Sequence, residues 1–313
     1  MPTEPAKFLI VVCGPTAVGK TTVAIELATA IDTEIISADS RQFFREMNIG
    51  TAKPTKEELK SVKHHFINSL SVQDEYNVGM FERDALKILE GIFKKKKVAI
   101  LVGGSGLYIN AVCNGFDEIP EADQGIRSNL TERYKREGIA YLQSTLNKLD
   151  EDHYKKMDIK NPHRLIRAIE VCMTTGKKYS ELRKGEKQKR NFSLIKIGLN
   201  MDREKLYEKI NSRVDAMIAQ GLLEEIKSLA PFKVGGDAGA PILNSLQTVG
   251  YKELFEHLDA KHELGRAIEL IKQNTRNLAK RQITWFRKDK DIQWFTPEDL
   301  EGMLKFVNIH SGR

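Results

Sequence analysis

The sequence has few cysteines, and its first hydrophobic run is short. Cys13, Cys113 and Cys172 are far apart, odd in number and form no C-x-x-C pair. This spacing argues against a disulfide framework and against a zinc site. It is typical of a reducing compartment, so we expect a cytoplasmic protein. The apolar run 8–13 is too short to cross a membrane, and no signal peptide precedes it, so we expect no membrane partner.

Neither charge sign is scarce, but basic residues are in excess. The 313 residues include 50 Lys and Arg against 43 Asp and Glu, which gives a formal net charge of +7. If the excess is clustered, it favours a polyanionic partner; if it is spread evenly, it means only a solvated surface. With 41% hydrophobic residues, the chain can form one large domain or two smaller ones. We see no fixed-period repeat and no low-complexity tract.

A strand, a glycine loop and a helix are predicted in that order near the start of the chain. Residues 8–13 read as a buried parallel strand, the loop matches G-x-x-x-x-G-K-T, and a helix follows over 22–30. Backbone N–H groups of such a P-loop, with the helix N-terminus, bind phosphate oxygens. We expect Lys20 to reach the terminal phosphate and the Thr21 hydroxyl to bind Mg²⁺. The predicted diphosphate-binding loop is Gly14, Pro15, Thr16, Ala17, Val18, Gly19, Lys20 and Thr21.

The next predicted strand, over 33–39, ends in an acid. In a parallel sheet the carboxyl end of this strand lies at the same edge as the P-loop, so Asp39 is placed beside the phosphates. A helix N-cap is the alternative role for Asp39, and the two roles are compatible. His64 and His65 follow on a short strand; adjacent strand residues face opposite ways, so we interpret them as structural rather than as metal ligands.

The third clear strand, over 97–102, lacks an acid at its end and runs into Gly103, Gly104 and Ser105. A nucleotide hydrolase usually has a magnesium-holding Asp there, so this absence counts against an ordinary ATPase. The elements together predict an α/β fold of the P-loop NTPase type, in which helices flank a parallel sheet.

Between 117 and 190, strand patterns disappear and helical patterns dominate. We predict a helical insertion domain over 117–190 and a core domain over 1–116 and 191–313. The best-formed helix of the insertion starts at Asn161-Pro162, and Leu165, Ile166, Ile169 and Cys172 form its apolar stripe. Arg164 and Arg167 share another face, which from charge alone is a solvated one.

The core resumes with a strand over 192–199 and a helix that contains Arg213, and it closes with a basic helix around 268–288. Ile268, Ile271, Leu278 and Trp285 recur at helical spacing and are predicted to pack inward. Lys272, Arg276 and Lys280 are four residues apart and form one basic ridge. No acid falls between Glu269 and Asp289, so the ridge is a candidate nucleic-acid track.

Taken together, these stretches resemble the tRNA dimethylallyltransferases, also called tRNA isopentenyltransferases. The P-loop alone is shared by many enzymes, but its conjunction with Asp-Ser-x-Gln, Gly-Thr-Ala-Lys-Pro and Ala-Lys-Arg-Gln-x-Thr-Trp is specific. The matching stretches occur in the family's order over nearly the whole chain: 14–21, 37–42, 48–54, 102–108, 163–171, 249–253 and 275–286.

The resemblance implies transfer of a dimethylallyl group from dimethylallyl diphosphate to N6 of the adenine next to the tRNA anticodon. The P-loop would hold the diphosphate, and Lys20, Arg213 and Mg²⁺ on Thr21 would stabilise this leaving group. Asp39 would be the general base, acting on an adenine flipped out of its stack. The implied tRNA contacts, to which we add the basic closing helix, are Asp39, Ser40, Arg41, Gln42, Ser105, Arg127, His163, Arg164, Leu165, Ile166, Arg167, Lys272, Arg276, Lys280 and Arg281.

Some positions depart from the family's pattern. Val18 stands where Ser is usual, Phe43-Phe44 replaces an aliphatic-Tyr pair, Met80 replaces an acid and Ser105 replaces Thr. No cysteine follows Cys172 in these 313 residues, so we expect no zinc finger of the eukaryotic kind and a bacterial-type enzyme that is a monomer.

Two other functions remain open from the sequence. One is a P-loop small-molecule kinase in which Asp39 activates a substrate hydroxyl. It leaves the basic closing helix and the insertion without a purpose. The other is an RNA-binding protein whose P-loop has become a structural anion site, which only Val18 encourages.

Overall fold

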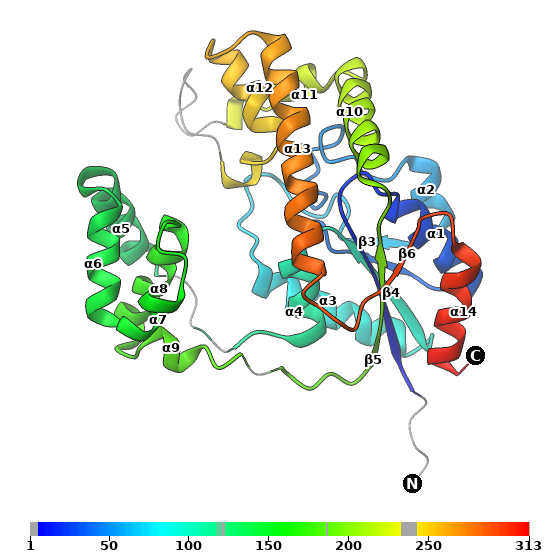
Figure 1. Cartoon of the computed structure of the whole chain (residues 1–313). Helices are drawn as coiled ribbons and strands as arrows, with labels where there is room; N and C mark the ends of the chain where they lie inside the picture. The colour runs from blue at the N-terminus through cyan, green and yellow to red at the C-terminus, as the bar shows by residue number, and fades with distance from the viewer. Residues whose placement is uncertain (1–5, 118, 120–122, 186, 233–242, 313) are drawn as a thin grey trace. The chain divides into compact units, whose positions relative to one another are not determined.

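The computed structural model describes residues 6–117, 119, 123–185, 187–232 and 243–312. The chain divides into two compact units, one formed by residues 1–113 and 190–313 and the other by 114–189. The first, the core unit, contains the sheet (Figure 1). In the second, the insertion unit, the described residues form helices and no strand.

All strand pairs of the core sheet are parallel, and its strand order is β3-β2-β4-β1-β5-β6. The central strand β1 pairs with β4 on one side and with β5 on the other. This confirms the expected P-loop-type α/β fold. The strand bounds are β1 (Phe8–Cys13), β2 (Ile35–Ser37), β3 (His64–His65), β4 (Val98–Gly103), β5 (Ser193–Leu199) and β6 (Gln293–Phe295).

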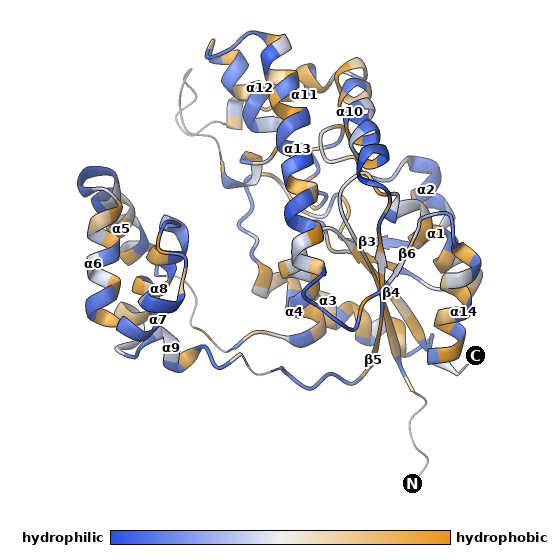
Figure 2. Cartoon of the chain, in the orientation of Figure 1, coloured by the Kyte–Doolittle hydropathy of each residue, from blue (hydrophilic) through white to orange (hydrophobic). Residues whose placement is uncertain are grey.

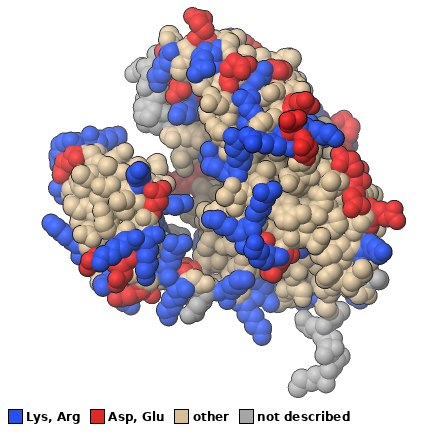
Figure 3. All heavy atoms as spheres, viewed as in Figure 1, with Lys and Arg blue, Asp and Glu red and all other residues tan. Residues whose placement is uncertain are grey.

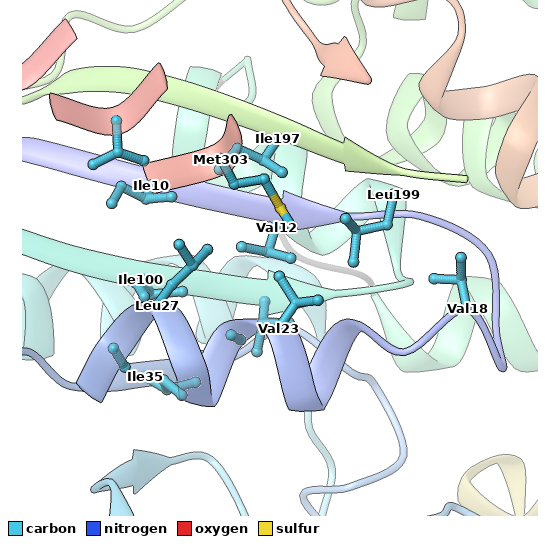
Figure 4. Packing of buried hydrophobic residues seen from close by; sticks show 14 of the residues in the cluster. Ile10, Val12, Val18, Val23, Leu27, Ile35, Ile100, Ile197, Leu199 and Met303 are labelled. Atoms are coloured by element: carbon cyan, nitrogen blue, oxygen red, sulfur yellow. The ribbon is translucent and has the colours of Figure 1, made fainter. Parts of the chain in front are cut away.

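Helices cover both faces of this sheet (Figures 1 and 2), which explains why β1 is apolar throughout rather than alternating. Ile10 and Val12 pack into one hydrophobic cluster, shown in Figure 4, while Leu9 and Val11 pack into another. The helices of the core unit are α1 (Lys20–Ile31), α2 (Lys56–Ser61), α3 (Val78–Phe93), α4 (Gly106–Asn114), α10 (Arg203–Ala219), α11 (Leu222–Ser228), α12 (Tyr251–Leu258), α13 (Leu264–Phe286) and α14 (Leu300–Ser311), with short 3₁₀ turns at Ala230–Phe232 and Asn244–Leu246.

The insertion unit packs its helices around Leu130, Leu142, Leu146, Leu165 and Ile169. Three of its helices, α5, α7 and α8, begin at side-chain caps. At α8 the Asn161 side chain accepts a hydrogen bond from the Arg164 backbone N–H, and proline occupies the first turn. The sequence signal for this helix is therefore confirmed. The helices are α5 (Gln124–Glu137), α6 (Ile139–Leu149), α7 (Glu151–Lys156), α8 (Pro162–Thr175) and α9 (Tyr179–Leu182).

The closing helix α13 differs from its prediction at Trp285. This side chain is 43% exposed, and the buried residue at the end of the helix is its neighbour Phe286. Ile271 is buried as expected, whereas Ile268 and Leu278 are only partly buried. The expected inward face was therefore wrong at Trp285, because Phe286 fills the last buried position of the helix.

Within the described residues, no helix combines the length and the apolar composition that crossing a membrane requires.

Cys13, Cys113 and Cys172 are all buried free thiols. Burial raises the pKa of Cys13 and Cys113 to about 12, so both remain protonated at neutral pH. The adjacent histidines also have separate structural partners: His65 contacts the Glu34 carboxylate and His64 contacts the Val62 carbonyl.

Candidate active site

The loop after β1 has the backbone shape of an anion-binding loop. Gly14 has φ 151°, and a Cβ at this position would lie 2.5 Å from the Leu199 carbonyl oxygen, so no larger residue fits. Ala17 adopts a left-handed conformation with φ 65°, which costs energy for a residue with a Cβ. Helix α1 starts at Lys20 with no side-chain cap, which leaves its N-terminal N–H groups available to an anion.

The Lys20 side chain folds back over this loop. Its Nζ donates a hydrogen bond to the Pro15 carbonyl over 2.7 Å. Burial lowers the pKa of Lys20 to about 8; Asp39 opposes this change and the positive charge of Arg213 adds to it. A partly buried ammonium with such a low pKa gains strongly from an incoming anion.

Asp39 lies just beyond β2, in the electrostatic neighbourhood of three cations. Its carboxylate influences the pKa values of Lys20, Arg41 and Arg213, and burial lowers the pKa of both arginines. Its Oδ1 also accepts a hydrogen bond from the Arg41 backbone N–H over 2.9 Å. Asp39 therefore caps a turn, not a helix as the alternative reading of the sequence had it, and its charge acts on the lysine of the phosphate loop.

Two serines predicted from separate motifs meet beside Asp39. The Ser40 backbone N–H donates to Ser105 Oγ over 3.2 Å. The side chain of Gln42 has internal partners: its Oε1 accepts from Ser37, and its Nε2 donates to the carbonyls of residues 51 and 52. Gln42 thus holds the Gly-Thr-Ala-Lys-Pro loop in place.

Val18, which removes a hydroxyl from the family's loop, is fully buried in the hydrophobic cluster of Figure 4. Its side chain therefore faces the protein core rather than the phosphate loop. Phe43 and Phe44, the second departure, are 1% and 4% exposed, and both rings pack among apolar neighbours.

A magnesium ion fits the donors only if phosphate supplies most of its ligands. In the part of the chain that the structure describes, no three acids, histidines or cysteines are grouped to hold a metal. Mg²⁺ is commonly bound by one or two protein oxygens together with substrate phosphates and water. The Thr21 hydroxyl, at the start of α1, suits that kind of site.

The predicted basic ridge of α13 is partly neutralised by α10. Lys272 forms an ion pair with Asp215 over 2.8 Å, and Arg276 donates to the Asn211 side chain over 2.6 Å. Lys280 and Arg281 are exposed. Figure 3 shows Lys and Arg side chains gathered on this face of the core unit. The absence of acids between Glu269 and Asp289 therefore does not leave every cation free, because Lys272 pairs with Asp215 of α10 and with Glu269 of α13 itself.

In the insertion unit, a buried acid connects two predicted site residues. Glu170 is fully buried. Its carboxylate forms ion pairs with Arg127 over 2.8 Å and with Arg167 over 2.7 Å. Glu170 lies within the stretch 163–171 but was not predicted as a site residue. Glu170 and Asp150 are both 0% exposed, but Asp150 bonds Ser180 and a backbone N–H, whereas Glu170 pairs with two arginines.

The remaining predicted residues of α8 separate into two groups. His163 and Arg164 are exposed at the start of the helix. Leu165 and Ile166 are 0% and 8% exposed and belong to the core of the unit, where they support the helix. Their predicted contact with tRNA stays a prediction.

The parallel sheet and the glycine loop between β1 and α1 define an α/β protein of the P-loop type. A family model described as IPP transferase matches residues 42–289. A tRNA dimethylallyltransferase of Christiangramia forsetii is 53% identical over 290 residues, which cover 93% of each chain. One from Flavobacterium psychrophilum is 49% identical over 96% of this chain and 98% of its own. The chain therefore belongs to the IPP transferase family of prenyl-group transferases.

Solved structures agree with this assignment. The tRNA isopentenylpyrophosphate transferase of Bacillus halodurans aligns with a TM-score of 0.68 and 37% identity, covering 98% of this chain and 95% of its own. A eukaryotic dimethylallyltransferase acting on tRNA aligns with a TM-score of 0.80 and 27% identity, over 98% of this chain and 80% of its own.

Proposed function

We propose that the protein transfers the dimethylallyl group of dimethylallyl diphosphate to N6 of adenosine 37, next to the anticodon of tRNA, and releases diphosphate. The observation that carries this proposal is the placement of Asp39 among Lys20, Arg41 and Arg213 at the edge of the P-loop. The relatives are named tRNA dimethylallyltransferases and match over nearly their whole length, which supports tRNA and a dimethylallyl donor as the two substrates.

The diphosphate of the donor binds the loop from Gly14 to Thr21. As the allylic C–O bond breaks, negative charge develops on the diphosphate, and Lys20 and Arg213 stabilise it from preorganised positions. Mg²⁺, when bound on the Thr21 hydroxyl, neutralises part of the same charge. These groups stabilise the leaving group more than the bound substrate, which accelerates the bond cleavage.

Asp39 is the proposed general base. The N6 lone pair is delocalised into the adenine ring, so N6 is a poor nucleophile until its proton is removed. As the N6–carbon bond forms, the Asp39 carboxylate accepts that proton. The adenine reaches the site by leaving its stack, at a cost of roughly a few kcal/mol, and residues 39–42 with Ser105 receive it.

The remaining predicted residues form the proposed tRNA-binding surfaces. On the core unit these are Lys272, Arg276, Lys280 and Arg281; on the insertion unit they are Arg127, His163, Arg164 and Arg167. Glu170 fixes the directions of Arg127 and Arg167. We place the reaction in a reducing cytoplasm, to which three free thiols are suited, and we propose a monomeric enzyme.

The decisive assay incubates the protein with Mg²⁺, unmodified tRNA and dimethylallyl diphosphate, and then measures prenylated adenosine in digested RNA by mass spectrometry. We expect prenylation without ATP and none after chelation of Mg²⁺. If the protein formed no prenylated adenosine but consumed added ATP, this would indicate the kinase alternative. Bound tRNA with no product at all would indicate the RNA-binding alternative.

A further inference from the structure

Trp285, in the last turn of α13, lies against the glycine-rich segment that follows β4, beside the start of α4 (Figure 1). A Cβ at Gly106 would lie 2.2 Å from Trp285 Nε1 and 2.3 Å from its Cδ1, so only glycine allows this contact. The tryptophan is nevertheless 43% exposed, and Leu107, the next residue of α4, is 46% exposed. The contact with the glycine therefore holds the indole in place and leaves much of it open to solvent.

The hydrophobic core does not require this indole. Phe286, the next residue of α13, fills the last buried position of the helix and packs into a cluster of the core unit. An exposed ring that is fixed by a glycine contact is suited to stacking, because it loses little conformational freedom when a flat ligand covers it.

The segment 104–106 separates Trp285 from the proposed acceptor site. Its middle residue, Ser105, accepts a hydrogen bond from the Ser40 backbone N–H over 3.2 Å, beside the proposed general base. Its last residue, Gly106, is covered by α13 instead. Trp285 therefore lies next to the acceptor site and not inside it, so a ring stacked on its indole is not the adenine that reacts.

The surroundings of Trp285 favour an unpaired RNA base as its partner. Arg281 lies one turn earlier on the same face of α13, and Lys288 follows the end of the helix; both are exposed. Cations beside an exposed aromatic ring suit a nucleotide, because the ring stacks on the base while the cations bind phosphates. The anticodon loop is single-stranded, so the bases beside the reacting adenine are available for stacking.

We propose that Trp285 stacks on the anticodon-loop base next to the adenine that is prenylated. When that adenine leaves its stack, a face of each neighbouring base becomes uncovered, and the indole covers one of these faces. The new stack offsets part of the cost of flipping and holds the loop where the adenine enters beside Ser105. This inference rests on the proposed function, and it makes Trp285 a tRNA-binding residue of the same site.

The first test follows the fluorescence of Trp285 in the full-length protein. The chain has two tryptophans, so Trp294→Phe leaves Trp285 as the sole emitter. Titration of this variant with unmodified anticodon stem-loop RNA is expected to quench most of the emission. Of two RNAs with an abasic nucleotide on one or the other side of the acceptor adenosine, one should lose this quenching. Trp285→Phe is the matched control, and the emission of its remaining tryptophan should not change.

The second test separates stacking from a purely structural role. Trp285→Ala is expected to raise the KM for tRNA about tenfold, the effect of losing one base–aromatic stack, while its affinity for pyrophosphate stays that of wild type. Trp285→Phe keeps an aromatic ring and should restore most of this loss. Ile309→Ala, which shortens an exposed apolar side chain on α14, should leave the KM unchanged.

Three results would overturn the inference. One is binding of labelled RNA to the Trp294→Phe protein, measured by anisotropy, without a change in Trp285 emission. Another is quenching that both abasic RNAs retain, because the indole would then contact something other than a neighbouring base. The third is a folded Trp285→Ala protein with the wild-type KM for tRNA. Quenching without prenylation would refute only the proposed function, prenylation without quenching only the role of Trp285, and a protein that binds no RNA both.

Discussion

Raising the pH above 8 is expected to weaken the binding of pyrophosphate to this protein through Lys20. Burial lowers the pKa of this lysine from 10.5 to about 8 in the free protein. A bound diphosphate favours the charged ammonium, so binding above pH 8 must take up a proton. The affinity contributed by Lys20 is therefore fully present below pH 8 and is lost as the pH rises through it.

The magnitude follows from the charged fraction. About half of Lys20 is protonated in the free protein at pH 8 and about a tenth at pH 9, so the contribution of Lys20 to affinity falls about fivefold between these two values. For folding the sign is opposite. Between pH 8 and 10.5 the unfolded chain binds more protons at Lys20 than the folded chain, so this residue adds stability as the pH rises.

The assay measures pyrophosphate affinity from pH 7 to 9.5 for wild type and for Lys20→Met. Pyrophosphate titrates as well, but this titration is common to both proteins and cancels in the ratio of their dissociation constants. The ratio should be largest near pH 7, should fall about fivefold between pH 8 and 9, and should fall more steeply, toward about tenfold per unit, above pH 9. A ratio that stays constant over the whole range would refute the assignment of a low pKa to Lys20.

Three further predictions concern the other groups of the site. Asp39→Asn should keep tRNA binding but lower the prenylation rate about 10²–10⁴-fold, as loss of a general base does; near-normal turnover would leave Asp39 only as a cap. Glu170→Ala should destabilise the insertion unit by about 2 kcal/mol, which would be measured as reduced hydrogen-exchange protection in α8. This loss is smaller than for a fully buried ion pair because Arg127 and Arg167 are partly exposed. Lys280→Ala should reduce the salt dependence of tRNA binding by a slope of about 1, while Lys272→Ala should reduce it less because Asp215 already neutralises that lysine; equal slopes would contradict this order.

The local elements of the fold could be predicted because their signals are local. The apolar run 8–13 became β1, and Asn161-Pro162 began α8, since burial of a central strand and capping of a helix depend on neighbouring residues. The edge position of Asp39 could also be predicted, because parallel strands present their carboxyl ends together. Trp285 could not be placed from spacing alone, because helical periodicity does not say which of two adjacent apolar residues fills the last buried position.

The sequence by itself determined the phosphate loop, the placement of Asp39 at the end of a strand and the resemblance to a family. Each of these depends on patterns within a few neighbouring residues. Only the tertiary structure decided which charges remain available. Asp215 pairs with Lys272 from another helix, buried Glu170 pairs with Arg127, and Gln282 of α13 accepts a hydrogen bond from the Thr16 backbone N–H of the phosphate loop. These pairings depend on how helices pack across the sheet and within the insertion unit, and no local pattern records the partner of a side chain that lies far away in sequence.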